Sequence, residues 1–163
     1  MKYFFTSLVL ILFFSGCSHQ NAFSKFKMDE KQELSASSLQ SSKIKSGEDI
    51  RGIFSAIYLN EVYPESFNQK EYFFVYLYLK EKKIMHNPNA LNDAELTLKL
   101  NGRPPIKIKQ LPHANRFSHL AFTQSEWNSY YLVAFEEEGK ELSLVLESGD
   151  SLSDALLYKK DEQ

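Results

Sequence analysis

The run Tyr72–Lys80 (YFFVYLYLK) restricts the fold of this chain more than any other segment. Successive side chains of an extended strand point to opposite faces of a sheet, so alternate residues of this run share a face. The first face would carry Phe73, Val75, Leu77 and Leu79. The second would carry Tyr72, Phe74, Tyr76 and Tyr78. The pattern predicts a β-strand in which neither face is polar.

The aromatic face of this predicted strand has two interpretations. In the first, the strand is buried on both sides, or a loop or the N-terminal segment covers it. In the second, Tyr72, Phe74, Tyr76 and Tyr78 are exposed and bind a protein or a glycan, since tyrosine supplies a large contact area at low entropic cost. If the face is buried, the loops around Arg103 and Trp127 become the next candidates for a binding site.

Alternating patterns separated by turn signals continue from Asp49 to the end of the chain. The segment 106–109 lies between Pro105 and Pro112 and has outward lysines, which is typical of a sheet edge. Segments 130–136 and 141–147 are expected to form a hairpin, because a short loop with a glycine joins them. The remaining predicted strands are 53–59, 95–100, 117–122 and 154–158.

These patterns indicate an all-β domain over residues 49–163. They amount to about seven or eight short strands in about 110 residues, with no long amphipathic helix. The number and spacing of the strands resemble the immunoglobulin-like fold. We therefore expect a two-sheet antiparallel β-sandwich.

The N-terminal residues resemble a bacterial lipoprotein signal. Tyr3–Phe14 is an apolar run of about a dozen residues, too short to cross a membrane comfortably, and it ends in small residues before a cysteine. Phe14-Ser15-Gly16-Cys17 is similar to the lipobox of this family, although the family usually has leucine where Phe14 stands. The resemblance implies removal of residues 1–16 and attachment of a diacylglycerol and a further acyl chain, such as palmitate, to Cys17. Ser18 resembles the sorting signal of outer-membrane members.

Two other interpretations of the N-terminus stay open, namely an ordinary secreted protein cleaved nearby and an uncleaved anchor. Residues 17–48 are expected to form a flexible tether beyond the lipid. The serine-rich segment Ser35–Ser42 cannot bury enough apolar surface to offset the entropy of ordering. A short helix over Lys25–Leu34, capped by Ser24, is the only element that the pattern suggests there.

Composition excludes several classes of site. The chain has 19 basic and 21 acidic residues, which gives no electrostatic case for nucleic-acid binding. Cys17 is the only cysteine, so neither a disulfide nor a soft metal site is expected. His86, His113 and His119 do not have a recognisable ligand spacing, and we expect no metal and no other cofactor.

Gly149-Asp150-Ser151-Leu152 matches the nucleophile motif of the GDSL hydrolases. That family needs a histidine downstream of the motif, and this chain has none there. We predict that the motif is a polar turn between two strands. The carboxylates at 136–138 and at Glu141 are interpreted in the same way, as a solvated turn.

The sequence therefore predicts a non-enzymatic binding or adhesion module in the cell envelope. The lipid on Cys17 would hold it in the outer membrane, and its partner would be a protein or a glycan. One alternative is a structural accessory of an envelope complex that faces the periplasm. A weaker alternative is a hydrolase that uses carboxylates.

Overall fold

Nine strands and two short helices make up the part of the chain that the computed structural model describes. That part comprises residues 29–81, 83, 85, 96–120, 125–136 and 139–160. The helices are α3 (Glu30–Ser38) and α4 (Leu59–Val62). The strands are β1 (Leu39–Ser46), β2 (Asp49–Tyr58), β3 (Glu71–Leu79), β4 (Thr97–Leu100), β5 (Lys107–Leu111), β6 (Asn128–Phe135), β7 (Glu141–Ser148), β8 (Ser151–Ser153) and β9 (Leu156–Lys159).

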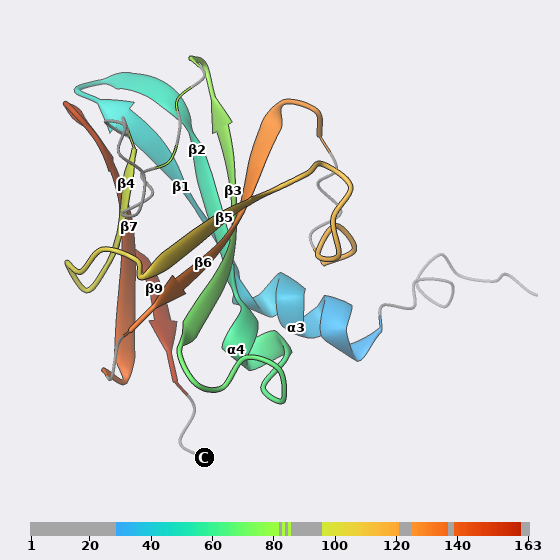
Figure 1. Ribbon diagram of the computed structural model, residues 1–163. Helices are drawn as coiled ribbons and strands as arrows, with labels where there is room; N and C mark the ends of the chain where they lie inside the picture. The colour runs from blue at the N-terminus through green and yellow to red at the C-terminus, as the bar shows by residue number, and fades with distance from the viewer. Residues whose placement is uncertain are drawn as a thin grey trace, which may run out of the picture.

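The strands form one antiparallel sheet that curls into a half-barrel (Figure 1). Their order is β4-β7-β8-β1-β2-β3-β6-β5, and β9 pairs with β7 beside this path. The all-β prediction is confirmed. The expected sheet edge near residues 106–109 is also confirmed, because β5 ends the order and pairs only with β6.

The concave face of the half-barrel holds the main hydrophobic core. Side chains from seven strands meet there, and the leucines of β4 are fully buried as their alternation predicts. The curled sheet has two limbs: one contains β2, β3, β6 and β5, and the other contains β4, β7 and β9. Aromatic rings from both limbs pack together in the core. The ring of Phe73 on β3 lies 5.3 Å from that of Tyr158 on β9 and 6.0 Å from that of Phe135 on β6, between ring centroids.

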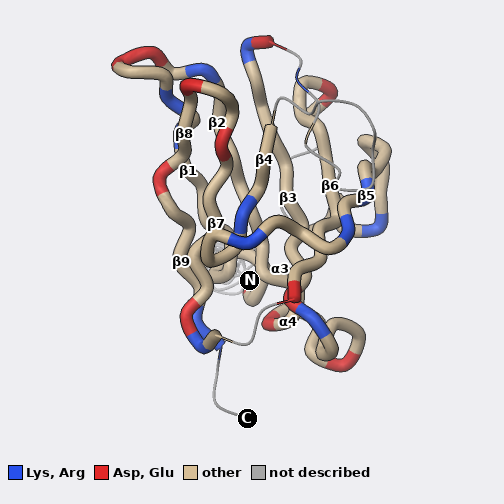
Figure 2. The backbone as a smooth tube through the Cα atoms, turned by 60° about the vertical axis from the view of Figure 1, so that its left-hand side comes forward, with Lys and Arg blue, Asp and Glu red and all other residues tan. Residues whose placement is uncertain are grey.

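A second apolar cluster lies on the outer face of β2, β3 and β6. Helices α3 and α4 and the loop 112–120 contribute to it, so both faces of these strands are buried at their centre. Ser35 of α3 donates a hydrogen bond to the carbonyl of Leu120 at 2.8 Å, which ties the helix to that loop. Charged residues lie mainly at the ends of strands and in turns (Figure 2).

The predicted tether is wrong for residues 29–48, because these residues belong to the domain. Helix α3 starts with a capping box between Asp29 and Gln32, five residues after the start predicted for a helix at Lys25. Strand β1 lies inside the sheet, where it pairs with β2 on one side and with β8 on the other. The domain therefore begins before Asp49.

Strand β1 escaped the sequence analysis because polar contacts, not apolar burial, hold most of it. Ile44 is its one buried hydrophobic residue. The amide of Gln40 accepts a hydrogen bond from the Leu157 N–H at 2.8 Å and donates to the same residue's carbonyl. The hydroxyl of Ser42 accepts from the Asp154 N–H at 2.9 Å. These side chains link β1 to the segment around β9, and no hydrophobic alternation reports them.

Two further predictions from the sequence are wrong. Strands β6 and β7 do not form a hairpin, because β6 pairs with β3 and β5 while β7 pairs with β4, β8 and β9. The chain crosses between the limbs of the half-barrel at this point. Residues 117–120 of the predicted strand 117–122 form a turn, and the last two residues of that prediction lie outside the described part.

Gly52 on β2 is required by a close approach to β3. A Cβ at this position would lie 2.7 Å from the Leu79 side chain and closer still to the Tyr78 carbonyl oxygen. We expect Gly52→Ala to lower the free energy of unfolding by about 1–3 kcal/mol, because the backbone of β3 must move. Gly47 has a φ of 59° and open space around it.

Gly47→Asn is the matched control for this substitution. Asparagine tolerates the left-handed conformation, so it should cost less than about 1 kcal/mol. Urea unfolding of both variants checks the prediction. An alanine at position 52 that is no more costly than the asparagine at position 47 would contradict it.

Candidate functional site

A cleft of about 550 Å³ opens on the concave face, at the end of the half-barrel where β3 and β5 end and β6 begins. Leu77, Leu79 and Tyr131 form its apolar floor, and the first and last of these belong to the main core. Such a volume lies within the range of about 300–1,000 Å³ that small-ligand sites occupy. The cleft is therefore our candidate binding site.

Trp127 lies at this cleft and is 81% exposed, the highest exposure among the large apolar side chains described. The turn that precedes β6 holds it there. Ser125 accepts hydrogen bonds from the Trp127 N–H through its hydroxyl, at 3.3 Å, and from the Asn128 N–H through its carbonyl, at 3.1 Å. The loop around Trp127, which the sequence analysis named as a fallback, thus contributes to the cleft.

Polar groups from four segments line the cleft. Gln110 comes from the end of β5, Asn128 from the start of β6, and Lys83 from the segment after β3. The ring of His113 also lines the cleft and packs edge-on against Tyr130, with 5.8 Å between centroids. Hydrogen-bonding groups thus stand around an apolar floor.

A smaller cavity of about 210 Å³ adjoins the cleft, since Leu79 and Lys83 line both. Its other polar walls include the buried residues Ser148 and Ser151. The Lys83 ammonium donates a hydrogen bond to the Ser148 hydroxyl at 3.1 Å. Lys83 therefore stands between the two cavities.

The Gly149-Asp150 pair of the hydrolase-like motif forms the turn between β7 and β8, as predicted. Gly149 has a φ of 55°, which glycine adopts without strain. Hydrogen bonds from Ser46, from the turn backbone and from the Ser151 hydroxyl lower the pKa of the Asp150 carboxyl, and Arg51 adds to the effect. Asp150 is thus held as a carboxylate at the rim of the smaller cavity.

The aromatic face of β3 is mostly core. Phe74 and Tyr76 are buried in the second cluster, and Tyr72 is half-buried against it. Tyr78 alone is exposed, at 42%. The exposed four-residue patch is therefore not formed, because α3, α4 and the loop 112–120 cover the middle of the strand.

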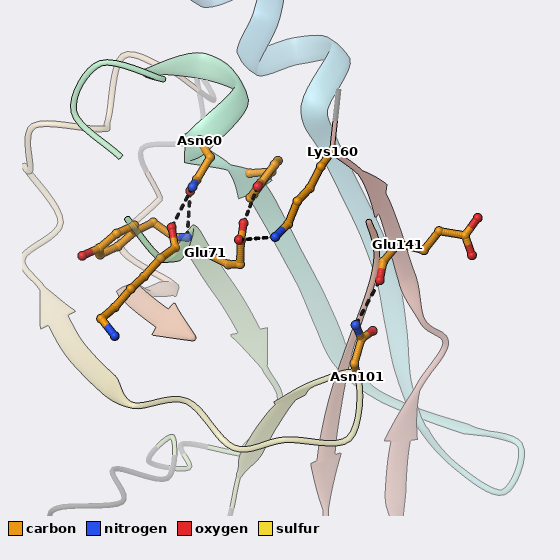
Figure 3. A network of polar contacts seen from close by, with 8 residues as sticks. Asn60, Glu71, Asn101, Glu141 and Lys160 are labelled. Atoms are coloured by element: carbon orange, nitrogen blue, oxygen red, sulfur yellow. Dashed lines mark hydrogen bonds and ion pairs between the residues drawn. The ribbon is translucent and has the colours of Figure 1, made fainter. Parts of the chain in front are cut away.

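A buried carboxylate lies at the opposite end of β3. Glu71 is 7% exposed, accepts a hydrogen bond from the Tyr58 hydroxyl and forms an ion pair with Lys160 (Figure 3). Asn60 of α4 binds the adjacent backbone, donating to the Lys70 carbonyl at 2.7 Å and accepting from the Tyr72 N–H at 2.8 Å. These contacts join α4 and the end of β9 to the start of β3, a structural role.

Tyr58 should make the protein sensitive to alkali. Burial, followed by the hydrogen bond to Glu71 and its charge, raises the pKa of this phenol well above its usual range. A raised pKa in the folded state gives stability that is complete below about pH 10, the unfolded value, and is lost as the pH rises further. From pH 10 to 12, we expect the free energy of unfolding to fall by up to about 1.4 kcal/mol per pH unit on account of this group.

Tyr58→Phe, compared with the parent protein in urea titrations at each pH, isolates this contribution. The variant should lose stability less steeply above pH 10 because it has no phenol to ionise at this position. Equal slopes for the two proteins would contradict the assignment.

The histidines and carboxylates for which no site was expected are dispersed. His113 lines the cleft, while His119 pairs with the Tyr63 hydroxyl at 2.8 Å. Glu136 forms an ion pair with Lys70 at 3.0 Å. Within the described ranges, no group of three or more His, Cys, Asp or Glu side chains could hold a metal ion. His86 and Cys17 lie outside the described residues.

Sequence reasoning missed Lys83, Gln110 and Ser148 as members of one site. They come together only because β3, β5 and β7 end at the same end of the curled sheet. No local pattern signals that convergence.

No protein-family model, curated protein or solved structure matches this chain. In the ranges that the structure describes, none of the helices has the length and apolar character needed to cross a membrane.

Proposed function

We propose that this protein is a lipid-anchored lipoprotein of the outer membrane whose β-domain binds a partner without catalysing a reaction. The Phe14–Cys17 resemblance to the lipobox supports the anchor. The cleft of about 550 Å³ carries the binding role, because an exposed tryptophan and several hydrogen-bonding groups surround its apolar floor. Exposed tryptophan side chains of this kind are frequent energetic anchors of binding sites.

Cys17→Ser should release the protein from membranes or leave an unprocessed precursor. Two or more acyl chains hold a protein stably at a bilayer, whereas a single chain binds marginally. The measurement is labelling with a palmitate analogue, followed by fractionation of cells that express the full chain. Ser18→Ala is the control, since it should leave lipid attachment intact. A Cys17→Ser protein that is processed and retained like the parent would rule out the anchor.

Exposure of the domain in intact cells separates a binding module from an accessory that faces the periplasm. We expect added protease to remove the domain from the cell surface. Full protection in intact cells, with cleavage after the outer membrane is opened, would favour the structural accessory.

We also propose that the half-barrel is a variant of the immunoglobulin-like two-sheet sandwich. The support is that opposite limbs of the curled sheet share one core, with Tyr58 of β2 and Tyr158 of β9 in ring contact at 5.9 Å between centroids. Tyr158 also donates a hydrogen bond across the core to the Ala56 carbonyl at 2.8 Å. In this view, the short strand β8 is the hinge between the two layers.

A further inference from the structure

We propose that the cleft and its adjoining cavity bind an acidic oligosaccharide, with one sugar ring against Trp127 and the carboxylate of a neighbouring sugar at Lys83. This inference rests on the proposed function, because it names the ligand class of the binding module. Three observations carry it: the exposed indole, the absence of a carboxylate partner of Lys83 among the described residues, and the two lining residues that the cavities share.

The Trp127 end of the cleft suits a sugar ring. A pyranose presents C–H groups on one face and hydroxyls around its edge. The indole offers a flat apolar surface, and the carboxamides of Gln110 and Asn128 line the same cleft. Each carboxamide both donates and accepts hydrogen bonds, which matches the hydroxyls of a sugar.

The Lys83 end suits a negative charge. The ammonium has three donors, and the structure gives it one hydrogen bond, to the Ser148 hydroxyl. Across the described ranges, no carboxylate lies within ion-pair distance of Lys83. Its side chain is half-buried, so water screens a bound anion less than it would on an open surface.

The lysines that line the smaller cavity agree with this assignment. Arg51, Lys80 and Lys83 line it, against the two carboxylates of Glu81 and Asp150. The Asp150 carboxylate already accepts hydrogen bonds from the hydroxyls of Ser46 and Ser151. Arg51 pairs with Asp49 at 3.7 Å, so Lys80 and Lys83 are the lining cations that have no ion-pair partner within the described residues.

Shared walls make one ligand possible across both cavities. Leu79 and Lys83 belong to both, and together the cavities run from Trp127 to the β7–β8 turn. An acidic peptide is the competing ligand. The structure favours a saccharide because the side chains of Gln110, Asn128 and Ser129 at the cleft both donate and accept hydrogen bonds, as sugar hydroxyls do.

The test is calorimetric titration of the full-length protein, purified in detergent, with tetragalacturonate. Maltotetraose is the neutral probe and tetraglutamate the peptide probe. Trp127 is the only tryptophan of the chain, so its fluorescence reports the same event independently. We expect tetragalacturonate to bind, to shift the tryptophan emission, and to bind more weakly as salt is added.

Two substitutions assign the subsites. Lys83→Met should weaken tetragalacturonate binding about tenfold or more, as loss of a charge-assisted hydrogen bond does. Trp127→Ala should weaken it by a similar factor. Lys43→Met is the matched control, because Lys43 is an exposed lysine of β1 that lines neither cavity, and it should leave the affinity unchanged.

Each other result would overturn the proposal. If maltotetraose binds as tightly as tetragalacturonate, Lys83 does not form an anion subsite. If tetraglutamate binds as tightly as tetragalacturonate, the site does not select a saccharide. If no probe binds, or if Lys83→Met leaves the affinity unchanged, the proposed saccharide site is wrong. The calorimetric results do not depend on whether Cys17 is lipidated. The ligand proposal can therefore be rejected while the labelling experiment still supports the lipid anchor.

Discussion

A chain that begins at Lys45 should not fold cooperatively, whereas one that begins at residue 28 should. The shorter chain lacks α3 and most of β1, which lies between β2 and β8. Without β1, the facing edges of β2 and β8 would be exposed, with unpaired N–H and C=O groups along them. The truncation would also remove Ile44 from the main core and uncover the second cluster, against which Leu34 and Leu39 pack.

Circular dichroism and thermal unfolding of the two shortened chains provide the measurement. The chain from residue 28 keeps the capping box of α3 and should show a sharp transition with a strand-type spectrum. The chain from Lys45 should show a broad transition or aggregate. Similar cooperative transitions in both would mean that β1 is dispensable, contrary to its place in the sheet.

Phe74→Ala should lower the free energy of unfolding by about 3–5 kcal/mol, although its neighbours on β3 already face a core on the other side. Phe74 is 1% exposed, and its ring packs against those of Phe117 and Tyr130 at 5.3 and 6.0 Å between centroids. Leu77→Ala, on the concave face, should cost about 2–5 kcal/mol. Both faces of the strand should thus be needed for stability.

Tyr78→Ala is the matched control within the same strand. This side chain is 42% exposed, so its loss should cost less than about 1 kcal/mol. Urea unfolding of the three variants distinguishes the two interpretations of the aromatic face. A Phe74→Ala protein as stable as the Tyr78→Ala protein would mean that α3, α4 and the loop 112–120 do not pack on β3.

Hydrophobic alternation located most of the sheet. It found β2, β3, β4, β6 and β7, since each of these strands buries apolar side chains on at least one face. It missed β1, which hydrogen bonds from Gln40 and Ser42 hold in place, and the short strand β8. The hairpin predicted from the short loop between β6 and β7 was also wrong, because this loop connects the two limbs of the curled sheet.

The site was less predictable than the fold. The loop around Trp127 was the second candidate for a binding site because binding residues are frequent in loops. The pairing of Lys83 with Ser148 joins residues 65 positions apart, and only the curl of the sheet brings them together. The burial of Phe74 and Tyr76 was equally hidden, because alternation shows that a face is apolar and does not show what covers it.

The intact mass of the mature protein tests the central claim most directly. Protein extracted with detergent from membranes of cells that process lipoproteins should have the mass of a chain that begins at Cys17, increased by a diacylglycerol and one further acyl chain. Fragmentation should place the added mass on Cys17. An unmodified cysteine, or a mature N-terminus at any other residue, would contradict the account.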